Sequence, residues 1–275
     1  GIRRKKNKVT YSKMTEHQIP LILSSATSNG AINKSPGGDF FEVIMQRPVT
    51  IPKEAKTASI ELNQSTVWNT VYNISTARTN NQFRITTDGS TYTITIPDGL
   101  YTLGQLEDTI DRELVNQGIG TGALQLIGDE ATQKVILSFI KSGQQVDFTV
   151  ANSCREILGF DSALYPPAPT TAATNVLAPN LAQFNLIDYY LLRCDIVGNG
   201  ININGQFKGV IAKMLISSPP GSQSINQPVN PVRVPIYGRI GQKISQIQCR
   251  ITDQAGNPLE LTDDWSMDTI IRYTL

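Results

Sequence analysis

Short runs in which apolar and polar residues alternate, separated by turn residues, constrain the fold of this chain more than any other feature. Tyr92, Ile94 and Ile96 alternate with threonines, and Ile247 and Ile251 flank Cys249 in a second alternating run. Because successive side chains of a strand point to opposite faces, each run predicts a strand with one buried face. About eight to ten such strands can be placed along the chain. The pattern predicts an all-β protein, a single jelly-roll β-sandwich of two packed antiparallel sheets.

One principal α-helix interrupts the strands. Thr102 precedes Gln105 by three residues, the spacing at which two side chains cap each other's backbone N–H groups. Apolar residues then recur every three or four positions as far as Gly118, at Leu103, Leu106, Ile110 and Leu114. We expect this helix to cover one side of the sandwich. Ser153 and Glu156 repeat the capping spacing and predict a single helical turn.

The first 40 residues have no sustained apolar period. They contain Pro20, Pro36 and the pair Gly37-Gly38, which disfavour regular structure. We therefore predict an extended basic N-terminal arm over residues 1–40.

Residues 41–275 are predicted to form the jelly-roll β-sandwich domain, with loop insertions. Residues 165–180 are rich in Pro, Ala and Thr and predict one long surface loop. Alternation resumes near the C-terminus, so we expect a strand pair within residues 244–275 to close the sandwich.

The predicted arm holds six basic residues before the first acidic residue, Glu16: Arg3, Arg4, Lys5, Lys6, Lys8 and Lys13. The other 18 of the 24 Lys and Arg residues are set against 23 Asp and Glu residues, so the formal net charge of +1 conceals a mildly acidic body. Such an arm can be a solvated tail or an anchor for an anionic partner. Nucleic acid, membrane headgroups and an acidic neighbouring subunit are the candidate partners, and composition does not choose among them.

Residues for catalysis or metal binding are scarce. His17 is the single histidine, which leaves too little material for a Ser-His-Asp triad or a histidine-rich zinc site. Carboxylates gather near the C-terminus without the ligand spacing of a calcium loop, at Glu260, Asp263, Asp264 and Asp268. The glycine-rich stretch 198–205 lacks the Lys and Ser or Thr of a phosphate loop. We expect no enzymatic activity, no metal and no cofactor.

Three cysteines are far apart and show no metal-binding spacing: Cys154, Cys194 and Cys249. We interpret them as buried free thiols in a reducing compartment. No apolar run approaches the ~20 residues of a membrane-spanning helix, and the N-terminus has no secretory signal. We therefore expect a soluble protein that is not secreted by that route.

Several segments, taken in order, resemble the penton (minor capsid) proteins of virophages and of Polinton-like (Maverick) viruses. Residues 59–74 look like the early strand pair of that family, and residues 80–85 with 96–106 look like its unit of strand, Pro-Asp-Gly turn and helix. IleLeuGlyPhe at 157–160 and the run at 247–261 are similar to its short turn and its closing hairpin. The receptor-binding Arg-Gly-Asp loop of some distant adenovirus penton bases has no counterpart in this sequence.

The resemblance implies a structural, non-enzymatic protein with a single jelly-roll fold. It implies a homopentamer at the fivefold vertices of an icosahedral virion, with contacts to the major capsid protein and assembly inside the infected host cell. The basic arm would then be an inner anchor that meets inner capsid proteins, nucleic acid or membrane.

Two other classes of function stay open at this point. A lectin-like or receptor-binding β-sandwich would use Trp68, Trp265 or the loop that begins at Tyr165. A glycosidase would use two carboxylates about 5 to 9.5 Å apart. Four carboxylates in strand-like runs are its candidates: Glu42, Glu61, Asp188 and Asp195.

Overall fold

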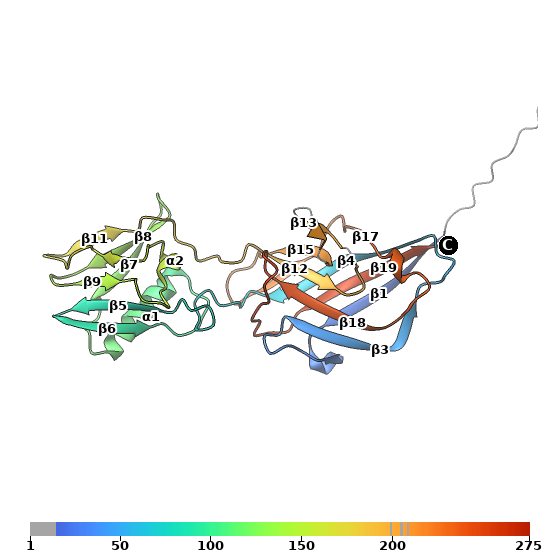
Figure 1. Cartoon of the computed structure of the whole chain (residues 1–275), viewed down its shortest axis with the longest axis horizontal. Helices are drawn as coiled ribbons and strands as arrows, with labels where there is room; N and C mark the ends of the chain where they lie inside the picture. The colour runs from blue at the N-terminus through green and yellow to red at the C-terminus, as the bar shows by residue number, and fades with distance from the viewer. Residues whose placement is uncertain (1–14, 199, 204–205, 208) are drawn as a thin grey trace, which may run out of the picture. The chain divides into compact units, whose positions relative to one another are not determined.

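The computed structural model describes residues 15–198, 200–203, 206–207 and 209–275 and divides into two compact units. The jelly-roll unit contains the described residues up to Trp68, together with Tyr189–Ser218 and Gln223–Leu275. The inserted unit contains Asn69–Asp188 and Pro219–Ser222. Figure 1 shows the elements of both units. No helix in the described ranges is long and apolar enough to cross a membrane.

Eight strands of the jelly-roll unit pair in a nested, antiparallel order. The first strand pairs with the eighth, the second with the seventh, the third with the sixth and the fourth with the fifth. In chain order these strands are β1 (Glu16–Ser24), β3 (Phe40–Thr50), β4 (Thr57–Trp68), β12 (Tyr189–Cys194), β15 (Val210–Leu215), β16 (Gln223–Asn226), β18 (Lys243–Thr252) and β19 (Ser266–Thr274). The nested pairing is jelly-roll topology, so the predicted fold class is confirmed.

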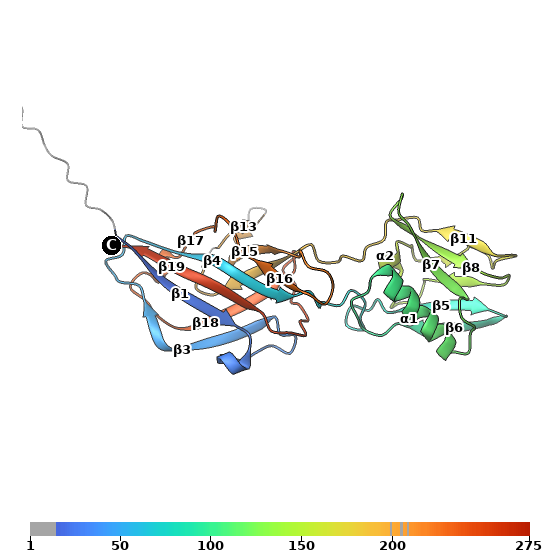
Figure 2. The ribbon, with the colours of Figure 1, turned by 180° about the vertical axis from the view of Figure 1, so that it is seen from behind.

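Two sheets result from this pairing (Figure 2). One has the order β1-β19-β4-β16, and β17 (Val234–Pro235) also pairs with β4. The other has the order β15-β12-β18-β3-β2, in which β2 is Ala31–Ile32. The chain passes between the sheets at their edges, from β1 to β2 at one edge of the sandwich and from β15 to β16 at the other.

The inward faces of the two sheets form the core of the jelly-roll unit. In β18, Ile247, Cys249 and Ile251 are buried and the residues between them are exposed, as the alternation predicts. Trp265 is only 1% exposed; its indole Nε1–H donates to the carbonyl of Gly38 at 2.9 Å. Its ring meets the Phe41 ring edge-on, with 5.0 Å between centroids.

The inserted unit has a core of its own between two small sheets and a helix. One sheet has the order β10-β9-β5-β6 and the other the order β11-β8-β7. These strands are β5 (Gln82–Thr87), β6 (Ser90–Thr95), β7 (Leu124–Asp129), β8 (Lys134–Phe139), β9 (Gln145–Asp147), β10 (Leu164–Tyr165) and β11 (Thr174–Leu177). Short elements complete the jelly-roll unit: the 3-10 turns Thr27–Asn29 and Tyr237–Arg239, and the paired strands β13 (Asn202–Ile203) and β14 (Gln206–Phe207).

Both predicted helices are present, and both belong to the inserted unit. α1 (Leu103–Asn116) begins with the expected capping box: Thr102 Oγ1 accepts from the Gln105 N–H, and the Thr102 N–H donates to Gln105 Oε1. α1 buries its apolar stripe and contacts β6 and β7 (Figure 2). It therefore covers the inserted unit, where we had expected it to cover the sandwich. α2 (Arg155–Leu158) is the predicted single turn.

The N-terminal segment differs from the prediction of an arm over residues 1–40. Within it, β1 and β2 lie in the two sheets of the sandwich, so the folded unit begins before residue 41. Pro20 lies at an exposed position of β1, between the less exposed Ile19 and Leu21, and an edge strand tolerates proline because one row of its backbone groups has no partner strand. Residues 1–14 lie outside the described part of the chain.

Three further expectations differ from the structure. Residues 41–275 are not one domain with loop insertions, because residues 69–188 bury a separate core, and the predicted surface loop at 165–180 contains β11, paired with β8. β18 and β19 do not form a closing hairpin: β18 pairs with β3 and β12, whereas β19 pairs with β1 and β4. Alternation identifies each strand, but it carries no information about the partner strand.

We predict that Thr102→Ala weakens the first turn of α1. Loss of an N-cap side chain costs about 1 kcal/mol, so amide exchange in the first turns of α1 should accelerate about fivefold. Hydrogen-exchange mass spectrometry of the peptide that covers α1 measures this. Thr121→Ala, at an exposed turn residue of the same unit, is the control, and equal acceleration in both variants would contradict the capping role.

Candidate interaction surfaces

The basic residues predicted as an inner anchor are not placed by the structure. Arg3, Arg4, Lys5, Lys6, Lys8 and Lys13 all lie outside the described residues. The nearest described element is β1, which pairs along its whole length with β19. An anchor at residues 3–13 would therefore be attached directly to a strand of the sandwich.

Four charged side chains form a closed ring of ion pairs on the outer face of the β1-β19-β4 sheet. Arg272 of β19 lies between two carboxylates: its Nη2 is 2.6 Å from Glu61 Oε1 on β4, and its Nη1 is 3.1 Å from Glu16 Oε2 on β1. Arg233 closes the ring at 3.3 Å from Glu61 Oε2 and 2.7 Å from Glu16 Oε1. The ring joins three strands and the segment before β17.

Glu61 and Arg272 are the buried half of this charge ring. The side chains of Glu61 and Arg272 are 7% and 16% exposed, against 36% for Glu16 and 54% for Arg233. The hydrogen bond that Arg272 donates to Glu61 raises the pKa of the guanidinium. Because two positive and two negative groups cancel, the charge ring is suited to holding strands together rather than to binding an ion. Sequence reasoning missed it because its four members are far apart along the chain.

The carboxylates considered for chemistry have partners within the protein. Glu42 accepts from Gln248 Nε2 and Asn33 Nδ2, both at 2.6 Å, and Asp195 Oδ1 accepts from the backbone N–H of Gln248 at 3.0 Å. Glu61 is in the charge ring, and Asp188 is the last residue of the main segment of the inserted unit. Glu42, Glu61 and Asp195 are therefore each engaged in a hydrogen bond or ion pair within the jelly-roll unit.

The C-terminal aspartates do not converge on one point. Asp264 Oδ1 is 2.5 Å from Lys34 Nζ and 2.9 Å from Ser25 Oγ, and the hydrogen bond from Lys34 lowers the pKa of this carboxyl. Within the described ranges, no three or more His, Cys, Asp and Glu side chains are grouped so that they could hold a metal ion.

The two tryptophans proposed for a sugar groove have different environments. Trp265 is wrong for that role, because it is buried in the core and its N–H is bonded to Gly38. Trp68 is 37% exposed at the end of β4. All three cysteines are buried free thiols, and burial raises the pKa of Cys154 to about 12, as expected for inert apolar side chains.

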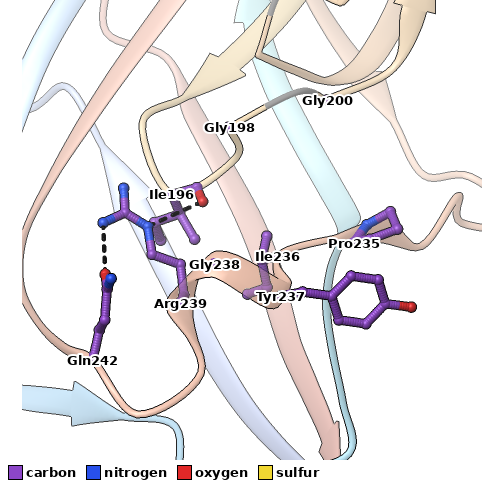
Figure 3. Close-up of a pocket in the computed structure, with 9 residues that line it drawn as sticks. All are labelled: Ile196, Gly198, Gly200, Pro235, Ile236, Tyr237, Gly238, Arg239 and Gln242. Carbon is purple, nitrogen blue, oxygen red and sulfur yellow. Dashed lines mark hydrogen bonds between the residues drawn. The ribbon is translucent and has the colours of Figure 1, made fainter.

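A pocket of about 530 Å³ opens in the jelly-roll unit beside the 3-10 turn at 237–239 (Figure 3). Ile196, Ile236 and Tyr237 contribute its apolar wall. Arg239 also lines the pocket, but its guanidinium already donates to the carbonyls of Asp195 and Ile196 and to Gln242 Oε1. The described lining of the pocket therefore combines aliphatic side chains with the Tyr237 ring and a guanidinium that is bonded within the protein. The described part of the glycine-rich stretch supplies Gly198 and Gly200 to the rim.

Large apolar side chains are exposed at both edges of the sandwich. Ile22 on β1 and Ile44 on β3 are 77% and 61% exposed at one edge. Leu215 on β15 and Ile225 on β16 are 60% and 57% exposed at the other edge. The segment before β17 adds Val229, which is 94% exposed. Large aliphatic side chains exposed along strand edges are candidates for protein contact surfaces.

No family model and no curated protein sequence matches the chain. A crystal structure of the mavirus penton protein matches with a TM-score of 0.50 and 8% identity, over 95% of this chain and 100% of that one. The chain has the fold of the mavirus penton protein. A chain of the Sputnik virophage cryo-EM structure matches over 93% of this chain and 97% of that one, with 12% identity and a TM-score of 0.38, too low to support an argument.

The match to the mavirus penton protein confirms, at the level of the fold, the resemblance that the sequence motifs predict. It spans both units, because 95% of the chain is covered. Within the inserted unit, the strand, turn and helix motif at 80–106 predicts the similarity to the penton family. That motif carries no information about a separate core.

We predict that the two arginines of the charge ring differ in their effect on stability. Arg272→Leu leaves Glu61 buried without its main partner and should lower the free energy of unfolding by about 2–3 kcal/mol. Arg233→Leu removes a half-exposed partner and should cost less than about 1 kcal/mol. Urea unfolding followed by tryptophan fluorescence tests this, because Trp68 and Trp265 both lie in the jelly-roll unit. Equal losses of unfolding free energy in the two variants would show that the burial of Glu61 does not determine the cost of removing its arginine partner.

Proposed function

We propose that the protein is a structural subunit of an icosahedral virus capsid, a penton that forms the fivefold vertices as a homopentamer. The observation that carries this proposal is the fold match to the mavirus penton protein over nearly the whole of both chains. On this proposal the protein resides in the virion, contacts the major capsid protein at the periphery of the pentamer, and is assembled in the infected host cell.

The exposed apolar edges of the sandwich support a ring. A head-to-tail ring needs two different surfaces on each subunit, one for each neighbour. The edge at β1 and β3 and the edge at β15 and β16 are two such surfaces, and each exposes large aliphatic side chains. We infer that one edge of each subunit packs against the opposite edge of the next.

The alternative function, a lectin-like or receptor-binding sandwich, has less support because one of its candidate binding residues, Trp265, is buried in the core. Trp68 and the segment that begins at Tyr165 are in different units. The proposal of a capsid subunit therefore has the better support.

The first test is the mass of the purified chain in solution. Light scattering should give about 150 kDa, five times the chain mass of 30.1 kDa. Ile44→Lys at one edge and Leu215→Lys at the other should each reduce the mass toward one protomer, because a charge in an apolar contact cannot be accommodated. Lys53→Glu, an exposed position outside both edges, is the control. A monomer for the unaltered chain would contradict ring assembly.

The second test concerns the basic arm as an inner anchor, a proposal motivated by its charge. Replacing Arg3, Arg4, Lys5, Lys6, Lys8 and Lys13 together by Gln should leave the mass of the oligomer unchanged, because none of them is among the exposed aliphatic residues proposed for the ring contacts. In a particle-assembly assay, occupancy of the vertices should fall at least severalfold, and the loss should be mimicked by high salt. Vertex occupancy equal to that of the unaltered chain would refute the proposed anchor. It would not contradict the proposed pentamer.

A further inference from the structure

Two arginines face each other across neighbouring strands of the jelly-roll unit. Arg193 of β12 lies directly opposite Arg250 of β18, and Arg250 lies opposite Phe40 of β3. Directly opposite residues share a face of the sheet, with Cβ atoms about 4.5–5.5 Å apart. Their chain neighbours Cys194 and Cys249 are buried, so the three side chains form one row on the outer face. We call Arg193, Arg250 and Phe40 the arginine row.

Like charges in this position are unfavourable for the sheet. Directly opposed charges of one sign destabilise an antiparallel pair. Burial and the charge of Arg250 lower the pKa of Arg193, the direction expected when a second guanidinium is near. Arg250 lies over the Phe40 ring at 5.1 Å, which holds it against the sheet. No carboxylate of the described residues forms an ion pair with Arg250.

A hollow lies over the arginine row. It has a volume of about 360 Å³, and its lining includes both arginines, Phe40, Asp195 and Val197. Asp195 does not neutralise both arginines, because its Oδ1 already accepts a hydrogen bond from the backbone N–H of Gln248. Positive groups, an aromatic ring and an apolar side chain thus converge on one open space.

The charges around the hollow indicate the kind of ligand. Of the side chains that line the hollow, Arg193 and Arg250 are positive and Asp195 is negative. The net charge of these lining side chains is +1, which matches a single carboxylate. A planar carboxylate suits the two-pronged hydrogen bonding of a guanidinium, whereas a polyanion such as nucleic acid would also meet Asp195.

We propose that the hollow over the arginine row binds a carboxylate side chain on an extended segment of a partner protein. Val197 and Phe40 would contact the apolar neighbours of that carboxylate. The site lies on the outer face of the sheet, over β12, β18 and the start of β3, and none of its lining residues is among the exposed aliphatic side chains proposed for the ring.

The test uses the full chain and two peptides, acetyl-Leu-Asp-Leu-amide and its Asn counterpart. Saturation-transfer NMR on the peptide protons is suitable because it tolerates a large assembly and weak binding. The Asp peptide should bind at least tenfold more tightly than the Asn peptide, as expected for one charge-assisted pair. Arg250→Gln should remove that tenfold preference, and Arg250→Lys should keep only part of it because the planar fork is lost.

Arg47→Gln is the matched control, since Arg47 is an exposed arginine of the same unit on β3. It should leave the preference for the Asp peptide unchanged. Equal binding of the two peptides to the unaltered chain would overturn the proposal. Displacement of the Asp peptide by inorganic phosphate at a concentration tenfold below that of acetate would also overturn it in favour of a phosphate site. Because the oligomer mass is measured separately, neither result bears on ring assembly.

Discussion

The antiparallel pairing of β1 with β19 is the contact on which the jelly-roll unit depends. Nine residue pairs in register, from Glu16 opposite Thr274 to Ser24 opposite Ser266, bring together the two ends of a nested set of strands. His17 stacks on Tyr273, and the Ser25 N–H donates to the carbonyl of Trp265, so both ends of the pair are fastened. The other three pairs are nested inside this one in chain order.

Alternation and capping predicted much of this structure, since both are local. The strands at 91–96 and 247–251 and the helix that starts at Thr102 follow from side chains within a few residues of one another. The choice of partner strand does not follow from nearby side chains. The sequence therefore predicts a hairpin of β18 and β19 that the structure does not contain. The inserted unit was missed for a related reason: its strands resemble those of the sandwich, and only contacts reveal that they enclose a separate core.

The candidate sites were harder to predict than the fold. The charge ring unites Glu16, Glu61, Arg233 and Arg272, which no spacing rule connects. The arginine row likewise depends on a register between β12 and β18 that the sequence does not display. The two outer faces of the sandwich therefore differ. On the β1-β19-β4 face, the opposite charges of the ring cancel and join strands. On the β12-β18-β3 face, two arginines of like charge lie side by side. The first arrangement contributes stability, and the second is tolerated at a cost that a ligand can offset.

The nested order also has a consequence for biosynthesis. Arg272 follows its partner Glu16 by 256 residues, so at ribosomal rates β1 waits about 10 to 50 s for β19 to emerge. The inserted unit is almost continuous in sequence and can bury its own core during this delay. Meanwhile β1 is a strand without a neighbour, a template for pairing with other nascent chains. Pro20 at its middle has no N–H to offer such a chain, so this proline limits the pairing of β1 with other chains during the delay.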